Sequence, residues 1–163
     1  MEKDFIQLIN TNRALIYKVC NLYCHVDDDK KDLFQEIVLQ LWTSYPNFRQ
    51  EAKTTTWLYR VALNTAISNF RKESRKPERS AISANELQIP DMNLYQPETD
   101  KVSLLQRAIE KLSEIEKAII MLYMDDKSYD DIAEIIGITH SNVGVRLNRI
   151  KTKLEKIIKA EEI

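Results

Sequence analysis

The segment SYDDIAEIIGITHSNVGVRLNRI, residues 128–150, contains the most informative local pattern of the chain. Ser128 and Thr139 each precede a stretch with helical spacing, and their hydroxyls can accept a hydrogen bond from a backbone amide of a first helical turn. Gly137 stands between the two stretches, and glycine is the preferred residue where a helix ends in the left-handed conformation. The pattern predicts a short helix up to Ile136, a glycine turn and a longer helix.

The longer helix combines one apolar edge with a polar and basic remainder. The edge recurs at helical spacing in Val143, Leu147, Ile150, Leu154 and Ile157. Ala133, four residues before the glycine, is small enough for two helices to cross closely. These features are typical of a helix-turn-helix, whose second helix enters the major groove of DNA. An ordinary helical hairpin within a bundle remains the alternative.

The other positions of the longer helix supply side chains that suit DNA. Asn can pair with adenine, Arg can pair with guanine, and a valine methyl can contact thymine. The residues that we expect to contact DNA here are Ser141, Asn142, Val145, Arg146, Asn148, Arg149 and Lys151.

Composition favours an all-α fold. Only 2 of the 163 residues are Gly, whereas β-architectures need glycine at tight turns. No stretch approaches the roughly 20 apolar residues that span a bilayer. The first ten residues lack the apolar core of a secretory signal, so we expect a cytoplasmic protein with reduced cysteines.

Prolines divide the chain into two parts. Three of the four prolines fall between residues 77 and 97, in a stretch without sustained periodicity. A segment this long without structure is unusual inside one compact domain. We therefore expect two small helical domains, residues 1–75 and 103–163, joined by a flexible linker over 76–102.

Helical spacing extends through the first domain. It predicts a first helix within residues 5–23, and a second from about 29 to 42 that ends before Pro46. A third helix is expected from Trp57 to about Arg71, with the threonines at 54–56 as N-cap candidates. Its expected inner face consists of Leu58, Val61, Ala62, Thr65 and Ile67.

The net charge of −1 hides a segregation of charges along the sequence. Five acids and one lysine lie between Asp125 and Glu134, whereas six basic residues and one acid lie between Arg146 and Lys159. A second basic cluster closes the first domain and includes Arg71 and Lys72. Such stripes can bind phosphates, although a solvated helix face is the commoner explanation of any single cluster.

Two groups of motifs resemble bacterial RNA polymerase sigma factors. DLFQE at 32–36, LW at 41–42 and TWLYRVALNTA at 56–66 resemble region two, and YDDIAE at 129–134 with RLNR at 146–149 resembles region four. Because only two domains are present, the resemblance is to the extracytoplasmic-function (ECF) group. It implies a dissociable polymerase subunit that directs promoter-specific initiation, with no catalytic residues, cofactor or bound metal.

The resemblance also implies roles for particular residues. The clamp helices of the largest polymerase subunit would be bound by Asp32, Gln35 and Glu36. The −10 element would be bound by Trp57, Tyr59, Arg60, Asn64, Arg71 and Lys72, with Asn64 as the base reader and Trp57 as a wall of a base pocket or simply a core residue. The −35 element would be bound by the seven helix-turn-helix residues named above.

The implied partners are core RNA polymerase, promoter DNA and an anti-sigma factor, with no small-molecule substrate and no insertion into a membrane. One rival is a dimeric helix-turn-helix regulator that never contacts polymerase, but region two would then have no purpose. Another rival is a helical metalloenzyme built on Cys20, Cys24 and His25, for which no fourth ligand is evident. A buried thiol pair explains the cysteines better.

Overall fold

The computed structural model describes residues 1–48, 53–75 and 100–162. The elements of the N-terminal half are α1 (Glu2–Thr11), α2 (Arg13–Tyr23), α3 (Asp27–Ser44), the 3-10 turn η1 (Tyr45–Asn47) and α4 (Thr54–Ser74). Those of the C-terminal half are α6 (Asp100–Glu110), α7 (Glu114–Met124), α8 (Tyr129–Ile136) and α9 (His140–Glu162). These ranges contain no strand, and the all-α prediction is confirmed. Helix α6 begins within the segment predicted as linker.

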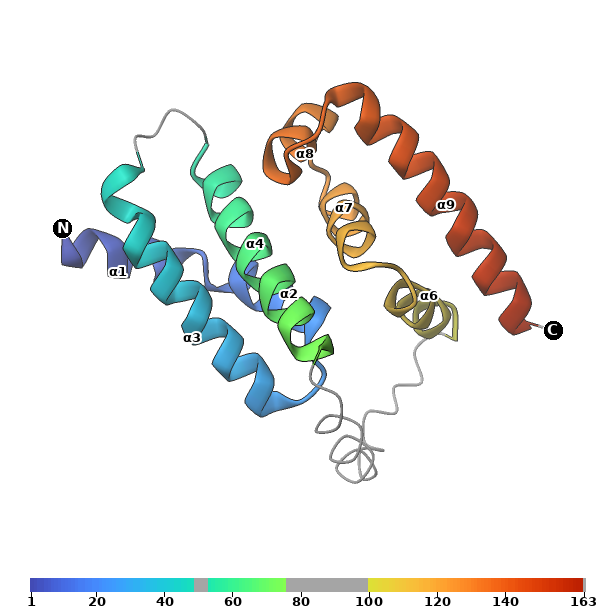
Figure 1. Cartoon of the computed structure of the whole chain (residues 1–163), viewed down its shortest axis with the longest axis horizontal. Coiled ribbons are helices and arrows are strands. Elements are labelled where there is room, and N and C mark those ends of the chain that lie inside the picture. Colours follow the sequence, from blue (N-terminus) through green and yellow to red (C-terminus); the bar gives the residue numbers. More distant parts are fainter. Residues whose placement is uncertain (49–52, 76–99, 163) are drawn as a thin grey trace.

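Helix α4 lies at the centre of the arrangement (Figure 1). Helices α2 and α3 pack against one side of it, and α7 and α8 from the other half of the chain pack against another. Helix α9 forms the outer edge, where it packs on α6, α7 and α8. The two halves are therefore in contact through α4.

The N-terminal half departs from the predicted helices at two places. The first predicted helix is two helices, because Asn12 interrupts it, and the Asn12 side chain donates a hydrogen bond of 2.9 Å to the Leu8 carbonyl. Helix α4 begins at Thr54 rather than Trp57, so the threonines are not its N-cap. Instead Lys53 holds the N-cap position without a side-chain hydrogen bond, and Thr56 is buried. The end of α3 before Pro46 is confirmed.

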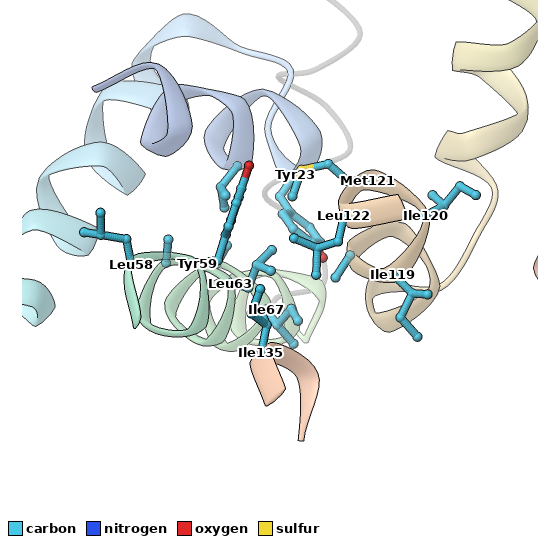
Figure 2. Close-up of a cluster of buried hydrophobic side chains, with 14 of the residues drawn as sticks. Tyr23, Leu58, Tyr59, Leu63, Ile67, Ile119, Ile120, Met121, Leu122 and Ile135 are labelled. Atoms are coloured by element: carbon cyan, nitrogen blue, oxygen red, sulfur yellow. The ribbon is translucent and has the colours of Figure 1, made fainter. Parts of the chain in front are cut away.

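More residues of α4 are buried than predicted. Leu58, Ala62 and Ile67 are buried as expected, whereas Val61 and Thr65 are only partly buried. The residues buried beyond the predicted face are Thr56, Trp57, Tyr59, Leu63 and Ala66. The prediction considered only the first domain. Part of the additional burial comes from Phe48, which stacks on Trp57, and part comes from the packing of α7 and α8 on the same helix (Figure 2).

The predicted helix-turn-helix signals of the C-terminal half are confirmed. The Ser128 hydroxyl accepts from the Asp131 amide at 3.0 Å, and the Thr139 hydroxyl accepts from the Asn142 amide at 3.1 Å. Gly137 ends α8 in the left-handed conformation, with φ +86°. The predicted apolar edge of α9 is buried at Val143, Leu147, Ile150 and Leu154 and partly buried at Ile157. Local sequence signals thus predict where α8 ends and where α9 begins.

The two glycines should respond to alanine in opposite directions. Gly137→Ala should lower the free energy of unfolding by about 1–2 kcal/mol, because an L side chain is strained at positive φ. Gly144→Ala should raise it by about 0.5–1 kcal/mol, because a Cβ in this α9 position meets only Tyr129, at an ordinary 3.6 Å. Thermal unfolding of both variants measures these changes. Equal shifts in melting temperature would contradict the left-handed turn assigned to Gly137.

Candidate nucleic-acid and protein interfaces

The solvent face of α9 carries all seven residues predicted to contact the −35 element. Each of Ser141, Asn142, Val145, Arg146, Asn148, Arg149 and Lys151 is exposed. Helical spacing places them opposite or beside the buried edge that begins at Val143. Because α9 is the outermost helix, this face is not covered by the N-terminal half (Figure 1). The predicted residues therefore form one continuous surface.

The flanks of this surface are held by contacts to neighbouring helices. The Lys151 ammonium lies 4.4 Å from the centre of the Tyr123 ring and donates to its hydroxyl at 3.1 Å, and this hydrogen bond raises the pKa of Lys151. In the first turn of α9, His140 Nδ1 is paired with Asp130 of α8. The ammonium of Lys151 and the imidazole of His140 thus border the polar face of α9, and each is held by a contact to a neighbouring helix.

The three residues predicted to bind polymerase are exposed together on α3. Asp32, Gln35 and Glu36 share one side of the helix, opposite the buried Leu33 and Ile37. An apolar hollow adjoins them, lined by Phe5, Phe34, Gln35, Val38, Leu39 and Trp42. The apolar side of α3 is therefore only partly buried, since Trp42 is 40% exposed. Mixed carboxylate and apolar surface of this kind suits a protein partner.

A polar groove of about 600 Å³ runs between α3 and α4. Asp32 and Glu36 line one wall, and Asn64 and Lys72 line the other. The structure thus brings residues predicted for polymerase and for the −10 element into one groove. Ser68 and Asn69 also line it and were not predicted, although Ser68 follows Asn64 at helical spacing on the same face.

The two aromatic residues predicted for the −10 element are buried. Trp57 is 8% exposed and stacks on Phe48, with ring centres 4.4 Å apart. Tyr59 is 2% exposed, and its hydroxyl donates to Asp125 at 2.7 Å. In this arrangement neither ring presents a face to a base, so the structure does not place them with Asn64 and Lys72.

Two predicted arginines contact the C-terminal half of the chain. The Arg60 guanidinium donates to the Glu134 carbonyl at 3.1 Å and lies 3.5 Å from the Glu134 carboxylate. Arg71 Nε donates to the Glu114 carboxylate at 2.8 Å, and this bond lowers the pKa of Glu114. Of the six residues predicted for the −10 element, these two and Tyr59 therefore contact α7 or α8.

Asp125, at the end of α7, joins three elements. It accepts hydrogen bonds of 2.7 Å from Lys18 of α2 and from Tyr59 of α4. Burial opposes the ionisation of Asp125, but these bonds outweigh it and lower the pKa of the carboxyl. Burial, and then the bond to Asp125, raises the pKa of Tyr59. Asp125 is thus an ionised acceptor between the halves.

Of the predicted buried thiol pair, Cys20 is buried within α2, whereas Cys24, the C-cap residue of this helix, is only partly buried. Burial raises the pKa of Cys20 to about 12 and of Cys24 to about 11, so both are protonated at neutral pH. His25 is exposed and lies 3.9 Å from Glu110 rather than beside a sulfur. Across the described ranges, no group of three or more His, Cys, Asp or Glu side chains could hold a metal ion.

Acid should weaken the contact between the halves. The pKa values of Asp125 and Glu114 are lowered, so their stabilisation is complete above the ordinary values of 3.8 and 4.5 and is lost as the pH falls below them. When the pH falls from about 7 to about 3, the free energy of unfolding of Asp125→Asn should therefore decrease by about 1 kcal/mol less than that of wild type. Urea unfolding measures this, with the exposed Asp4→Asn as control. Parallel pH profiles for all three proteins would contradict the role of Asp125.

Comparison with known proteins identifies both halves. The Sigma-70 region 2 family matches residues 8–76, and the Sigma-70, region 4 family matches residues 103–154. The RNA polymerase sigma factor YlaC of Bacillus subtilis is 30% identical over 138 residues, which cover 81% of this chain and 79% of YlaC. The ECF RNA polymerase sigma-E factor of Haemophilus influenzae is 28% identical over 142 residues, which cover 80% and 75% of the two chains.

Solved structures show the same fold at lower identity. The sigma factor RpoE of Bartonella quintana, solved with the anti-sigma factor NepR, superimposes with a TM-score of 0.72 at 21% identity and covers 96% of this chain and 98% of its own. CnrH, solved with the cytosolic domain of CnrY, gives a TM-score of 0.70 at 17% identity over 98% and 90% of the two chains. Among the described residues no helix could span a membrane. The chain belongs to the ECF group of RNA polymerase sigma factors, which direct promoter-specific transcription initiation.

Proposed function

We propose that this sigma factor binds core RNA polymerase through the exposed side of α3 and reads its promoters with two separate surfaces. The groove between α3 and α4 would receive the −10 element, and the solvent face of α9 would receive the −35 element. The observation that carries this proposal is that polar residues from the two motif sets lie on two exposed surfaces, one in each half of the chain. The protein would act in the cytoplasm, as a binding subunit rather than an enzyme.

The groove suits an unpaired nucleotide. Capture of a base from an opening duplex needs a pocket, polar groups that recognise the base edge, and cations for the phosphates. Asn64 provides an amide that can both donate and accept, and Lys72 provides a cation in the same groove. The carboxylates of Asp32 and Glu36 on the opposite wall would keep phosphates on the α4 side.

The α9 surface suits the major groove of duplex DNA. A helix-turn-helix directs the N-terminal part of its second helix to base edges, where Ser141, Asn142 and Val145 lie. Arg149 follows on the same face and can reach a guanine edge or a phosphate. We propose that Arg146 and Lys151, on the flanks, contact phosphates and position the helix.

An anti-sigma factor is the third proposed partner. The sigma factor RpoE of Bartonella quintana was solved with the anti-sigma factor NepR, and CnrH was solved with the cytosolic domain of CnrY. In this chain a largely apolar groove opens between α2 and α7, where Leu22, Ile120 and Met121 provide apolar contacts and Lys18 and Glu110 border them. An amphipathic helix would fit there because such grooves bind one apolar face of a helix.

Reconstitution with core polymerase tests the proposed function. The purified chain and core enzyme should produce defined transcripts from a genomic promoter library, whereas neither component alone should do so. Free protein should bind promoter duplexes weakly at physiological salt, since its net charge is −1 and non-specific affinity depends on phosphate neutralisation. Tight, sequence-specific binding of duplex DNA without any transcription with core would instead favour the dimeric regulator.

Reversing the charge of Glu36 should disrupt holoenzyme assembly. Glu36→Lys should weaken core binding about tenfold or more, because reversing a charge that has a complementary partner in an interface replaces attraction by repulsion. Stability should change by less than about 0.5 kcal/mol, because the side chain is exposed. Glu2→Lys makes the same charge change on exposed α1 and should bind core normally. Unchanged core affinity of Glu36→Lys would show that polymerase binds elsewhere.

Two alanine substitutions should separate the two DNA surfaces. Arg149→Ala should lower promoter affinity by about 1–3 kcal/mol and relax one −35 position if the side chain reads a base. If it contacts phosphate, all promoters should weaken alike and the salt dependence should fall by about one unit of slope. Asn64→Ala should alter selectivity at the −10 element alone, chiefly in open-complex formation.

Selection of promoters from a randomised library by each mutant holoenzyme measures both effects together. Lys156→Ala, an exposed cation nearer the end of α9, serves as the control for loss of a positive charge. A −35 shift with Asn64→Ala, or a −10 shift with Arg149→Ala, would overturn the assignment of the two surfaces.

A further inference from the structure

A histidine and a carboxylate are paired beside the turn of the helix-turn-helix. His140 is the first residue of α9, and its Nδ1 is hydrogen-bonded to the carboxylate of Asp130, in the first turn of α8. Tyr129 packs beside the imidazole, with ring centres 5.7 Å apart. The His140 side chain nevertheless remains 61% exposed. The contacts therefore position the ring and leave its second nitrogen, Nε2, without a hydrogen-bond partner among the described residues.

This imidazole lies on one flank of α9, where a DNA backbone would pass. In a helix-turn-helix the second helix enters the major groove while the first helix crosses the backbone, and the ring of His140 is held by that first helix, α8. His140, Gly144 and Lys151 follow at intervals of four and seven residues and so share the flank. A Cβ at Gly144 would meet Tyr129, and Lys151 contacts Tyr123. The flank thus carries an imidazole at its start and an ammonium about three turns later.

The protonation of His140 decides what this end of the flank offers to a phosphate. A neutral imidazole that donates through Nδ1 to Asp130 presents a lone pair at Nε2, which repels a phosphate oxygen. A protonated imidazole donates through both nitrogens, so it can bind Asp130 on one side and a phosphate on the other. Protonation also neutralises the negative charge that Asp130 otherwise adds here. Histidine is the side chain whose charge ordinarily changes between pH 5 and pH 8.

The titratable groups that face His140 come from α8. They are Asp130, which is hydrogen-bonded to the imidazole, and Tyr129, which packs beside it. Asp131, next in the chain, instead lies 3.5 Å from Lys53. On α9 itself, residues 141–144 carry no charge. Asp130 is thus the charged group that the imidazole contacts.

We propose that His140 is a pH-dependent phosphate contact of the α9 surface: its protonated imidazole donates through Nε2 to a phosphate of the duplex, while Asp130 positions the ring through Nδ1. The proposal rests on the proposed binding of the −35 element by α9. Because the protonated form binds DNA, binding takes up a proton, and promoter affinity rises as the pH falls. His140 affects affinity and not base preference, since phosphate contacts carry no direct sequence information.

The two histidines of the chain provide a matched test. His25 is also 61% exposed and also lies near a carboxylate, that of Glu110, but it is far from α9 in the sequence. Holoenzymes with wild type, His140→Gln or His25→Gln are compared at about pH 6 and about pH 8, where histidine changes charge. Fluorescence anisotropy measures their binding to a fluorescein-labelled duplex that carries one promoter from the transcribed library. The His25→Gln control removes the pH dependence of polymerase itself from the comparison.

The variants have distinct expected results. On lowering the pH, wild type and His25→Gln should gain about 3- to 10-fold more affinity than His140→Gln. At the lower pH, His140→Gln should also reduce the salt dependence by up to about one unit of slope. His140→Lys keeps a cation at both pH values and should bind tightly without this pH dependence. Asp130→Asn should weaken the pH dependence, whereas Asp126→Asn, which removes an exposed acid before α8, should keep it.

Arg149→Ala separates failure of this proposal from failure of the proposed function. If Arg149→Ala weakens binding while His140→Gln follows His25→Gln at both pH values, the α9 surface stands and the proposal for His140 is overturned. If His140→Gln loses the pH dependence while Arg149→Ala binds as wild type does, the phosphate contact stands and the role of Arg149 fails. If neither variant has an effect, both are wrong. Should no promoter complex form, the free chain and a short duplex of randomised sequence at low salt give the same comparison, because phosphate contacts do not depend on sequence.

Discussion

The packing of α4 from two sides is the constraint on which the rest of the structure depends. Its hydrophobic residues form the core of the N-terminal half with α2 and α3 and also contact α7 and α8. Tyr59 shows both roles, since its ring is buried while its hydroxyl reaches Asp125. A helix used in this way has little free surface. Between Thr54 and Phe70, only Asn64 and Ser68 are exposed.

This shortage of free surface separates the predicted −10 residues into two groups. Asn64 and Lys72 face the groove beside α3, where a ligand can reach them while the halves remain together. Tyr59, Arg60 and Arg71 contact the C-terminal half and become available only when that half moves away. Nucleic-acid binding by α4 would therefore occur in two stages, with the groove residues engaged first.

Local interactions explain which features the sequence predicts well. The Ser128 and Thr139 caps and the Gly137 turn each depend on residues within a few positions, and all three form as predicted. The exposed α9 face follows from the same helix periodicity. The packing of α7 and α8 on α4 and the position of Tyr59 depend on residues far along the chain, and no periodicity within the first domain records such contacts. Two local features were also missed, the break at Asn12 and the start of α4 at Thr54.

The apolar side chains packed between α4 and helices α7 and α8 also oppose separation of the two halves. Separation of the halves would expose Leu63 and Ile67 on one side and Leu122 and Ile135 on the other, at about 25 cal/mol for each Å² of apolar surface. Charged pairs can be replaced by water at little cost, whereas apolar surface cannot. This apolar layer therefore accounts for more of the cost of separating the halves than the ion pairs do.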